Sequence, residues 1–250
     1  YMPDGEFSGS NLWYVIDAGT GNVITSITAG TGPHNTIVSL NGKHVYMGGR
    51  YTPYLEVADT SSNTVTNKIG PLKSGGRPFS INGTETLSFT TSDNFLGFQV
   101  SNITTGQVMY TVPVNGFNNT GALLVPSHGI SLSPDEKQIY LMDGDNSYVH
   151  VFDVSGLPGS APTQVADIKL SKPIAGNSES GCAFDCGKEG WVLHSRDGRF
   201  VFVGDSGDII DTSTHKIVTN LTTLSNTRKY LEIDWQNGSP SFTTSRYGLG

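Results

Sequence analysis

Short segments in which apolar and polar residues alternate recur along the whole chain, and tight polar turns separate them. Three stretches show the pattern most clearly: residues 34–49 (HNTIVSLNGKHVYMGG), 128–143 (HGISLSPDEKQIYLMD) and 190–205 (GWVLHSRDGRFVFVGD). Such alternation is typical of half-buried strands, and turns rich in Asn, Asp, Gly and Pro join the strands of a hairpin. Weaker copies begin near residues 77 and 230. The pattern therefore predicts a repeated antiparallel hairpin.

A second kind of hairpin alternates with the first. Each copy has a strand, an Asp or a Ser, a turn of Thr, Ser and Gly, and another strand; the copies occupy residues 12–27, 54–69, 96–112, 148–156 and 208–221. The residues that open these turns are Asp17, Asp59, Ser101, Asp153 and Asp211, and the first three lie 42 residues apart. An Asp in this place accepts N–H groups of its own turn, so we assign these residues a structural role.

Four short antiparallel strands in about 42 residues form the pattern of a β-propeller blade. A blade is a twisted sheet that buries both faces only when other blades pack against it. A β-sandwich is the alternative, but it does not explain repeats that stay in register. We therefore predict one all-β propeller domain over residues 1–250, built of four-stranded antiparallel blades.

The number of blades has two interpretations. The chain begins with the outer half of a blade at residues 12–27, ends with the inner half of another at 228–247, and holds four full blades between them. The two halves join into a five-bladed ring, or an upstream fragment of the same precursor supplies about two more blades. We expect seven blades in the intact protein, of which this chain covers about five.

The repeat resembles the YVTN-type β-propeller repeat, a family related to seven-bladed lactonase-like propellers. The residues that carry the resemblance are Gly32-Pro33-His34, Asn41-Gly42-Lys43, Val15-Ile16-Asp17 and Thr20-Gly21-Asn22-Val23. The resemblance covers nearly all of the chain, favours seven blades, and implies a surface or secreted protein. It says little about activity, because propellers host many unrelated functions.

Composition and charge narrow the partners. The chain has 250 residues, of which 36% are hydrophobic and 10% aromatic, which is enough for a packed core. The net charge is −7, so a nucleic acid or an anionic membrane is not an expected partner. No apolar run approaches the roughly 18 residues of a membrane span.

Several features indicate a secreted glycoprotein. Five Asn-x-Ser/Thr sequons occur, at Asn82, Asn102, Asn118, Asn220 and Asn237. The only two cysteines, Cys182 and Cys186, lie close together in an insertion of the repeat, and we expect them to form a local disulfide. Because the chain opens without a signal peptide, we expect a mature or cleaved form.

The candidate ligand site is one mouth of the propeller channel, where the connections between blades and between the second and third strands meet. The residues in these connections are His34, Arg50, Arg77, His128, Arg228, Tyr230 and Arg246. The arginines are candidate ligands for a carboxylate, which a guanidinium binds through two hydrogen bonds, and we expect them to create a positive funnel. Capping of a neighbouring carbonyl by the histidines, and rim ion pairs of the arginines, are the structural alternatives.

Other polar residues have weaker functional interpretations. Asp143 and Asp145, with Asn146, offer oxygen ligands for a candidate Ca²⁺, although Asp-Gly-Asp-Asn is also an ordinary turn. No other cofactor motif occurs. We expect His194 to be a core histidine, and we expect three others to be solvated: His44, His150 and His215.

Two classes of function follow. An enzyme at the mouth fits β-elimination from a uronic acid, with His128, then His34, and Tyr230 as the proton-transfer candidates. The resemblance implies that a polysaccharide lyase comes first and a lactonase-like hydrolase second. The other class is a non-catalytic propeller for adhesion or interaction, which binds a glycan, a small molecule or a protein. Candidate side chains that face one ligand favour the enzyme, whereas side chains paired among themselves favour binding.

Overall fold

The computed structural model describes residues 1–174, 187–227, 229 and 231–244. The described chain is almost entirely β, and its one helical element is a 3₁₀ turn, η1 (Thr222–Leu224). None of the described helices is long and apolar enough to cross a membrane. Contacts divide the chain into two compact units, one of Tyr1–Asp93 and Phe98–Thr111, the other of Asn94–Gly97 and Val112–Leu249.

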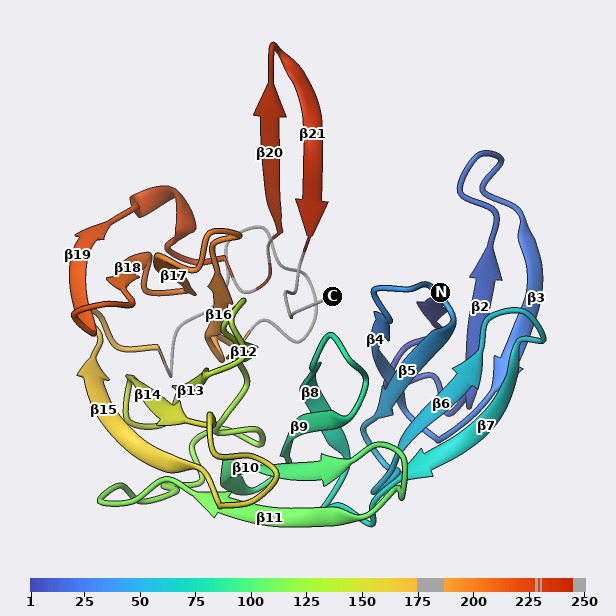
Figure 1. Cartoon of the computed structure of the whole chain (residues 1–250), viewed down its shortest axis with the longest axis horizontal. Coiled ribbons are helices and arrows are strands. Elements are labelled where there is room, and N and C mark those ends of the chain that lie inside the picture. The colour runs from blue at the N-terminus through green and yellow to red at the C-terminus, as the bar shows by residue number, and fades with distance from the viewer. Residues whose placement is uncertain (175–186, 228, 230, 245–250) are drawn as a thin grey trace. The chain divides into compact units, whose positions relative to one another are not determined.

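The first unit holds a three-stranded sheet, a four-stranded sheet and most of a second four-stranded sheet. The strands are β1 (Met2–Pro3), β2 (Leu12–Ile16), β3 (Val23–Thr28), β4 (Pro33–Val38), β5 (His44–Gly49), β6 (Leu55–Asp59), β7 (Thr64–Ile69), β8 (Gly76–Ile81), β9 (Leu87–Ser92), β10 (Phe95–Asn102) and β11 (Val108–Pro113). Neighbouring strands in each sheet are consecutive in the chain (Figure 1).

The second unit repeats the same plan. Its strands are β12 (Ile130–Leu132), β13 (Gln138–Asp143), β14 (Tyr148–Asp153), β15 (Thr163–Lys169), β16 (Trp191–His194), β17 (Phe200–Gly204), β18 (Asp208–Asp211), β19 (Lys216–Asn220), β20 (Glu232–Gln236) and β21 (Ser239–Thr244). They form two four-stranded sheets and the two-stranded sheet β20–β21 (Figure 1). The predicted fold of four-stranded antiparallel blades, with a half blade after them, is confirmed.

The core of the first unit lies between consecutive sheets. On β5, Val45 and Met47 point to one face and pack with Trp13 of β2, whereas Tyr46 points to the other face and packs with Phe79 of β8. Successive side chains of a strand point to opposite faces, so one strand contributes to two interfaces. Burial of each large apolar side chain contributes about 1.5–3 kcal/mol, which makes the interfaces between sheets the main source of stability.

The turn-opening residues act as predicted, with one change of register. The Asp17 carboxylate accepts the N–H groups of Gly19 and Thr20, and Asp59, Asp153 and Asp211 accept turn N–H groups in the same way. These hydrogen bonds lower the pKa of the carboxyls, that of Asp59 to about 2. In the third repeat the prediction of Ser101 is wrong by one residue.

The residue that opens the third turn is Asn102. Its side-chain oxygen accepts the Thr105 N–H, while Ser101 is fully buried within β10. β10 is eight residues long, whereas the matching strand β6 has five, so the turn begins later than simple spacing suggests.

Candidate functional site

Three of the predicted ligand residues converge on a single carboxylate in the first unit, and we call this group the carboxylate clamp. Arg50, which follows β5, places Nη1 2.9 Å from Glu6 Oε1, and Arg77 on β8 places Nη1 3.0 Å from Glu6 Oε2. His34 on β4 brings Nε2 to 3.6 Å from Glu6 Oε2. The carboxylate comes from the loop between β1 and β2, to which sequence reasoning gave no role.

The clamp is largely shielded from water. The side chains of Arg50 and His34 are each 14% exposed, that of Glu6 is 12% exposed, and that of Arg77 is only 4% exposed. Ion pairs are strengthened at such depth, but each charge loses hydration and depends on its partners. Removal of one partner therefore leaves an uncompensated charge behind.

A second carboxylate balances the arginines. Arg77 Nη2 lies 3.7 Å from Asp93 Oδ1, and the Asp93 side chain is 11% exposed. Burial raises the pKa of Asp93, Arg77 and Arg50 oppose that rise, and Glu6 adds to it. Two guanidinium groups thus face two carboxyl groups. Arg50 and Arg77 are each paired with an acid, so these two arginines give the clamp no net positive charge.

Close backbone packing fixes the position of Arg50. The Arg50 N–H donates to the Gly32 carbonyl at 2.7 Å, and the Phe7 ring lies 4.5 Å from the guanidinium carbon. Gly75 lies so near the Arg50 carbonyl that a Cβ atom there would collide with it. The loop after β5 therefore depends on a glycine in the chain ahead of β8, a contact that spacing along the sequence does not reveal.

The other predicted proton-transfer histidine lies in the second unit and is buried. His128 is 1% exposed, its Nε2 is 3.0 Å from Glu189 Oε2, and its Nδ1 is 3.2 Å from the Gly190 carbonyl. The Trp191 ring lies 5.9 Å away. Contact with a loop carbonyl is what the structural interpretation predicts. Because both ring nitrogens face protein oxygens, His128 is directed at its own fold.

Two further histidines are buried in the second unit. His194 is fully buried, as expected of a core histidine; Ser131 Oγ lies 2.8 Å from its Nδ1, and desolvation lowers its pKa to about 3. The prediction of a solvated His150 is wrong, because its side chain is 0% exposed. The loop after β11 covers this position, and the Phe117 ring packs 4.6 Å from the imidazole. Strand alternation alone did not reveal that cover.

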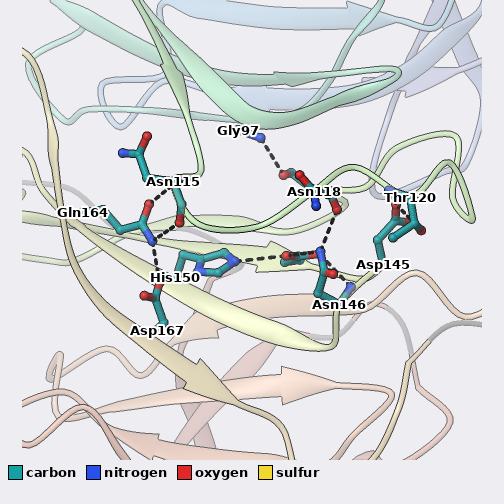
Figure 2. A network of polar contacts seen from close by, with 11 residues as sticks. Gly97, Asn115, Asn118, Thr120, Asp145, Asn146, His150, Gln164 and Asp167 are labelled. Atoms are coloured by element: carbon teal, nitrogen blue, oxygen red, sulfur yellow. Dashed lines mark hydrogen bonds and ion pairs between the residues drawn. The ribbon is translucent and has the colours of Figure 1, made fainter.

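The candidate Ca²⁺ ligands are engaged by protein donors. Figure 2 shows Asp145 against Thr120, whose N–H and hydroxyl both donate to it at 2.8 and 2.9 Å. Asp143 Oδ2 lies 3.1 Å from His150 Nε2 and accepts the Asn146 amide. Within the described ranges, no group of three or more His, Cys, Asp or Glu side chains is placed to hold a metal ion. The arrangement is that of a hydrogen-bonded turn.

His150 completes this polar network. Its Nδ1 lies 2.6 Å from Asp167 Oδ1 on β15, and Gln164 of the same strand exchanges hydrogen bonds with the backbone of Asn115 (Figure 2). The network thereby fixes the connection between β11 and β12 to the sheet β12–β15. These contacts link residues up to 49 positions apart.

The sequons differ in exposure. Asn118 and Asn237 are exposed, and Asn237 lies in the turn between β20 and β21. Asn82 is only 5% exposed, because its side chain folds back onto its own turn, where its amide donates to Thr84 and Thr86.

The side chains of the remaining two sequons, Asn220 and Asn102, are hydrogen-bonded within the protein. The Asn220 amide donates to Asp208 and to the Ser206 carbonyl, and the Asn102 side-chain oxygen accepts the Thr105 N–H.

Several predicted residues lie outside the described part of the chain, namely Arg228, Tyr230, Arg246, Cys182 and Cys186. The clamp and His128 belong to different units. One common funnel for all the candidates therefore stays a prediction. The sequence analysis did not identify Glu6 and Glu189 as partners of the candidate residues. The signal available for each was an acidic residue in a loop next to a predicted strand, with no basic partner obvious nearby in the sequence.

Comparisons with known proteins support the fold. No family model matches the chain, and no curated protein matches its sequence. The structure is similar to hydrazine synthase from Kuenenia stuttgartiensis, with a TM-score of 0.57 and 13% identity, over 81% of this chain and 57% of that chain. It is also similar to a chain of the mitotic checkpoint complex, with a TM-score of 0.59 and 15% identity, over 78% of this chain and 53% of the other.

These likenesses define the class of protein. The chain has a β-propeller fold and spans little more than half the length of either structure. At such low identity the likeness concerns the fold alone, and function has to be argued from the site.

Proposed function

We propose that this chain is part of a secreted, non-catalytic binding propeller that recognises an acidic glycan through its carboxylate clamp. The observation that carries the proposal is that Arg50, Arg77 and His34 all lie close to the two carboxylate oxygens of Glu6. Charge-assisted hydrogen bonds from guanidinium groups are the strongest that a protein offers a carboxylate. A uronic acid supplies such a group on a neutral sugar ring.

Binding fits the described residues better than catalysis. In both units candidate side chains are paired with acids of the same fold, Arg77 with Glu6 and His128 with Glu189, whereas a proton-transfer group has to face its substrate. His128 is 1% exposed and directed at Glu189 and Gly190, so its imidazole has no open path to a sugar. A lyase or a lactonase would need its proton donor in contact with the ligand.

The proposal of secretion rests on the sequons and on the two closely spaced cysteines of the sequence. Asn118 and Asn237 present exposed amides on connections between strands, where a glycan is accommodated without disturbing the sheets. The net charge of −7 also keeps the chain away from anionic surfaces, so recognition of an acid depends on a local clamp.

The test compares tetragalacturonate with the neutral cellotetraose by isothermal titration calorimetry. Arg50→Ala should weaken tetragalacturonate binding about tenfold or more, because a lost charge-assisted hydrogen bond costs about 1.5–3 kcal/mol. Arg199→Ala is the matched control, since Arg199 belongs to the second unit and lies over the Phe200 ring. The proposal is wrong if neither the wild-type chain nor the Glu6→Gln variant binds the acidic sugar better than the neutral one.

A further inference from the structure

The carboxylate that fills the clamp is delivered by a short surface loop. Residues 5–9 lie within the connection between β1 and β2, and Gly5 and Gly9 bound this loop with φ angles of 113° and 72°. No atom lies within 4 Å of the position of a Cβ at either glycine. The left-handed backbone and open surroundings at both ends leave the loop few contacts that hold it.

Only two side chains of this loop reach the clamp. Phe7 stacks on the Arg50 guanidinium but is 50% exposed, and Ser8 and Gly9 are exposed. The Ser8 hydroxyl donates to the Gly5 carbonyl and accepts the Ser10 N–H, so its hydrogen bonds stay within the connection between β1 and β2. The Glu6 side chain, in contrast, is only 12% exposed. Its ion pairs with Arg50 and Arg77 are thus the charged contacts that hold the loop on the clamp.

We propose that residues 5–9 form a displaceable strap, in which Glu6 occupies the clamp until the carboxylate of an acidic ligand replaces it. The inference rests on the proposed function, because it names the event that opens the same site. The free clamp is closed by the chain's own carboxylate, and binding is an exchange of one carboxylate for another.

The charges define the class of ligand. When Glu6 leaves and one carboxylate enters, Arg50 and Arg77 keep the same number of negative partners. A neutral group in the clamp would leave the two guanidinium groups under-compensated, and a second carboxylate in the clamp would add a charge next to Asp93. Three clamp atoms have no hydrogen-bond partner among the described residues: Glu6 Oε2, Arg77 Nε and Asp93 Oδ1. A hydroxyl group can accept from a guanidinium N–H and donate to a carboxylate, so we take the ligand to carry a carboxylate with an adjacent hydroxyl, as a uronate residue does.

The apparent affinity of the clamp for its ligand equals the affinity of the open clamp multiplied by the fraction of time that the strap is open. A clamp open for about a tenth of the time binds about tenfold more weakly than an open one. Glu6→Gln keeps the shape of the side chain but removes its charge, so it should raise the affinity for tetragalacturonate about tenfold or more. Asp4→Asn is the matched control, because Asp4 contacts Tyr14 instead and the change in net charge is the same.

A second measurement uses the unaltered chain. Endoproteinase Glu-C cleaves after glutamate, and the closed strap protects the bond between Glu6 and Phe7. Saturating tetragalacturonate should speed cleavage at this bond several-fold, whereas cellotetraose should not. The site is identified by mass spectrometry of the released N-terminal peptide, so the result does not depend on how a variant folds.

The outcomes separate the two proposals. Tighter binding by Glu6→Gln, with faster cleavage of the wild-type chain, supports the strap. Equal affinities of wild-type and Glu6→Gln chains for the acidic sugar, or cleavage that the ligand slows or leaves unchanged, overturn the strap and leave the proposed function intact. Failure of every form to prefer the acidic sugar overturns the proposed function and the strap with it.

Discussion

The buried imidazole of His194 should make the second unit lose stability as the pH falls below about 6.5. Its side chain is fully buried on β16, the Tyr140 ring meets it at 4.9 Å, and its Nε2 has no hydrogen-bond partner among the described residues. Desolvation lowers the pKa of His194 to about 3. The folded chain therefore keeps this imidazole neutral under conditions in which the unfolded chain protonates it.

The sign and the size of the effect follow from proton linkage. Below the unfolded pKa of about 6.5 the unfolded state binds more protons, so the free energy of unfolding falls by about 1.4 kcal/mol for each pH unit. The fall ends near pH 3, where the folded His194 protonates as well. Between pH 7 and pH 4.5 the contribution amounts to about 2.5 kcal/mol, or roughly 5–10 °C in melting temperature for a chain of this size.

The assay is urea unfolding between pH 4.5 and pH 7, followed by tryptophan fluorescence, on wild-type and His194→Phe chains. The phenylalanine variant should have lower absolute stability, because the Ser131 hydroxyl loses its imidazole partner and keeps only the N–H of residue 194, but its stability should depend less on pH. His215→Gln, at a half-buried turn position, is the control. Parallel loss of stability in the wild-type and His194→Phe chains would refute the reasoning.

Two further predictions concern the clamp and the glycans. Gly75→Ala should destabilise the first unit by about 1–3 kcal/mol in urea unfolding and weaken tetragalacturonate binding, because its Cβ must displace the Arg50 carbonyl; unchanged stability and binding would contradict this. In protein from its natural source, glycosidase treatment should reduce the mass in steps that map to Asn118 and Asn237, and an unchanged mass would exclude the secretory interpretation.

The repeated hairpins could be predicted from the sequence because their signals are local. Alternation on β5 assigns Val45 and Met47 to one face and Tyr46 to the other, and the structure places them so. The turn at Asp59 is specified within four residues by a side chain that accepts its N–H groups. Strand length varies between the repeats, and β10 is longer than its counterparts. A fixed spacing of 42 residues therefore predicts that Ser101 opens the third turn, whereas Asn102 opens it.

The sequence predicted the basic residues of the candidate site but not their acidic partner. The repeat register indicated that His34, Arg50 and Arg77 end on related connections, and these residues do meet. Their acidic partner could not be inferred, because Glu6 lies 44 positions from Arg50 and outside the repeated pattern. The arginines of the sequence therefore predicted a positive funnel, whereas in the structure Glu6 and Asp93 neutralise the charges of Arg50 and Arg77.

The sequence by itself determined the strands, their turns and the grouping of strands into blades, since each depends on hydrogen bonds and side-chain alternation within about 42 residues. Only the tertiary structure decided which polar groups are buried and which charges meet. The loop carrying Phe117 buries His150, and the loop carrying Glu6 fills the clamp. The physical reason is that desolvation and ion pairing depend on distances between segments far apart in the chain, which no local pattern encodes.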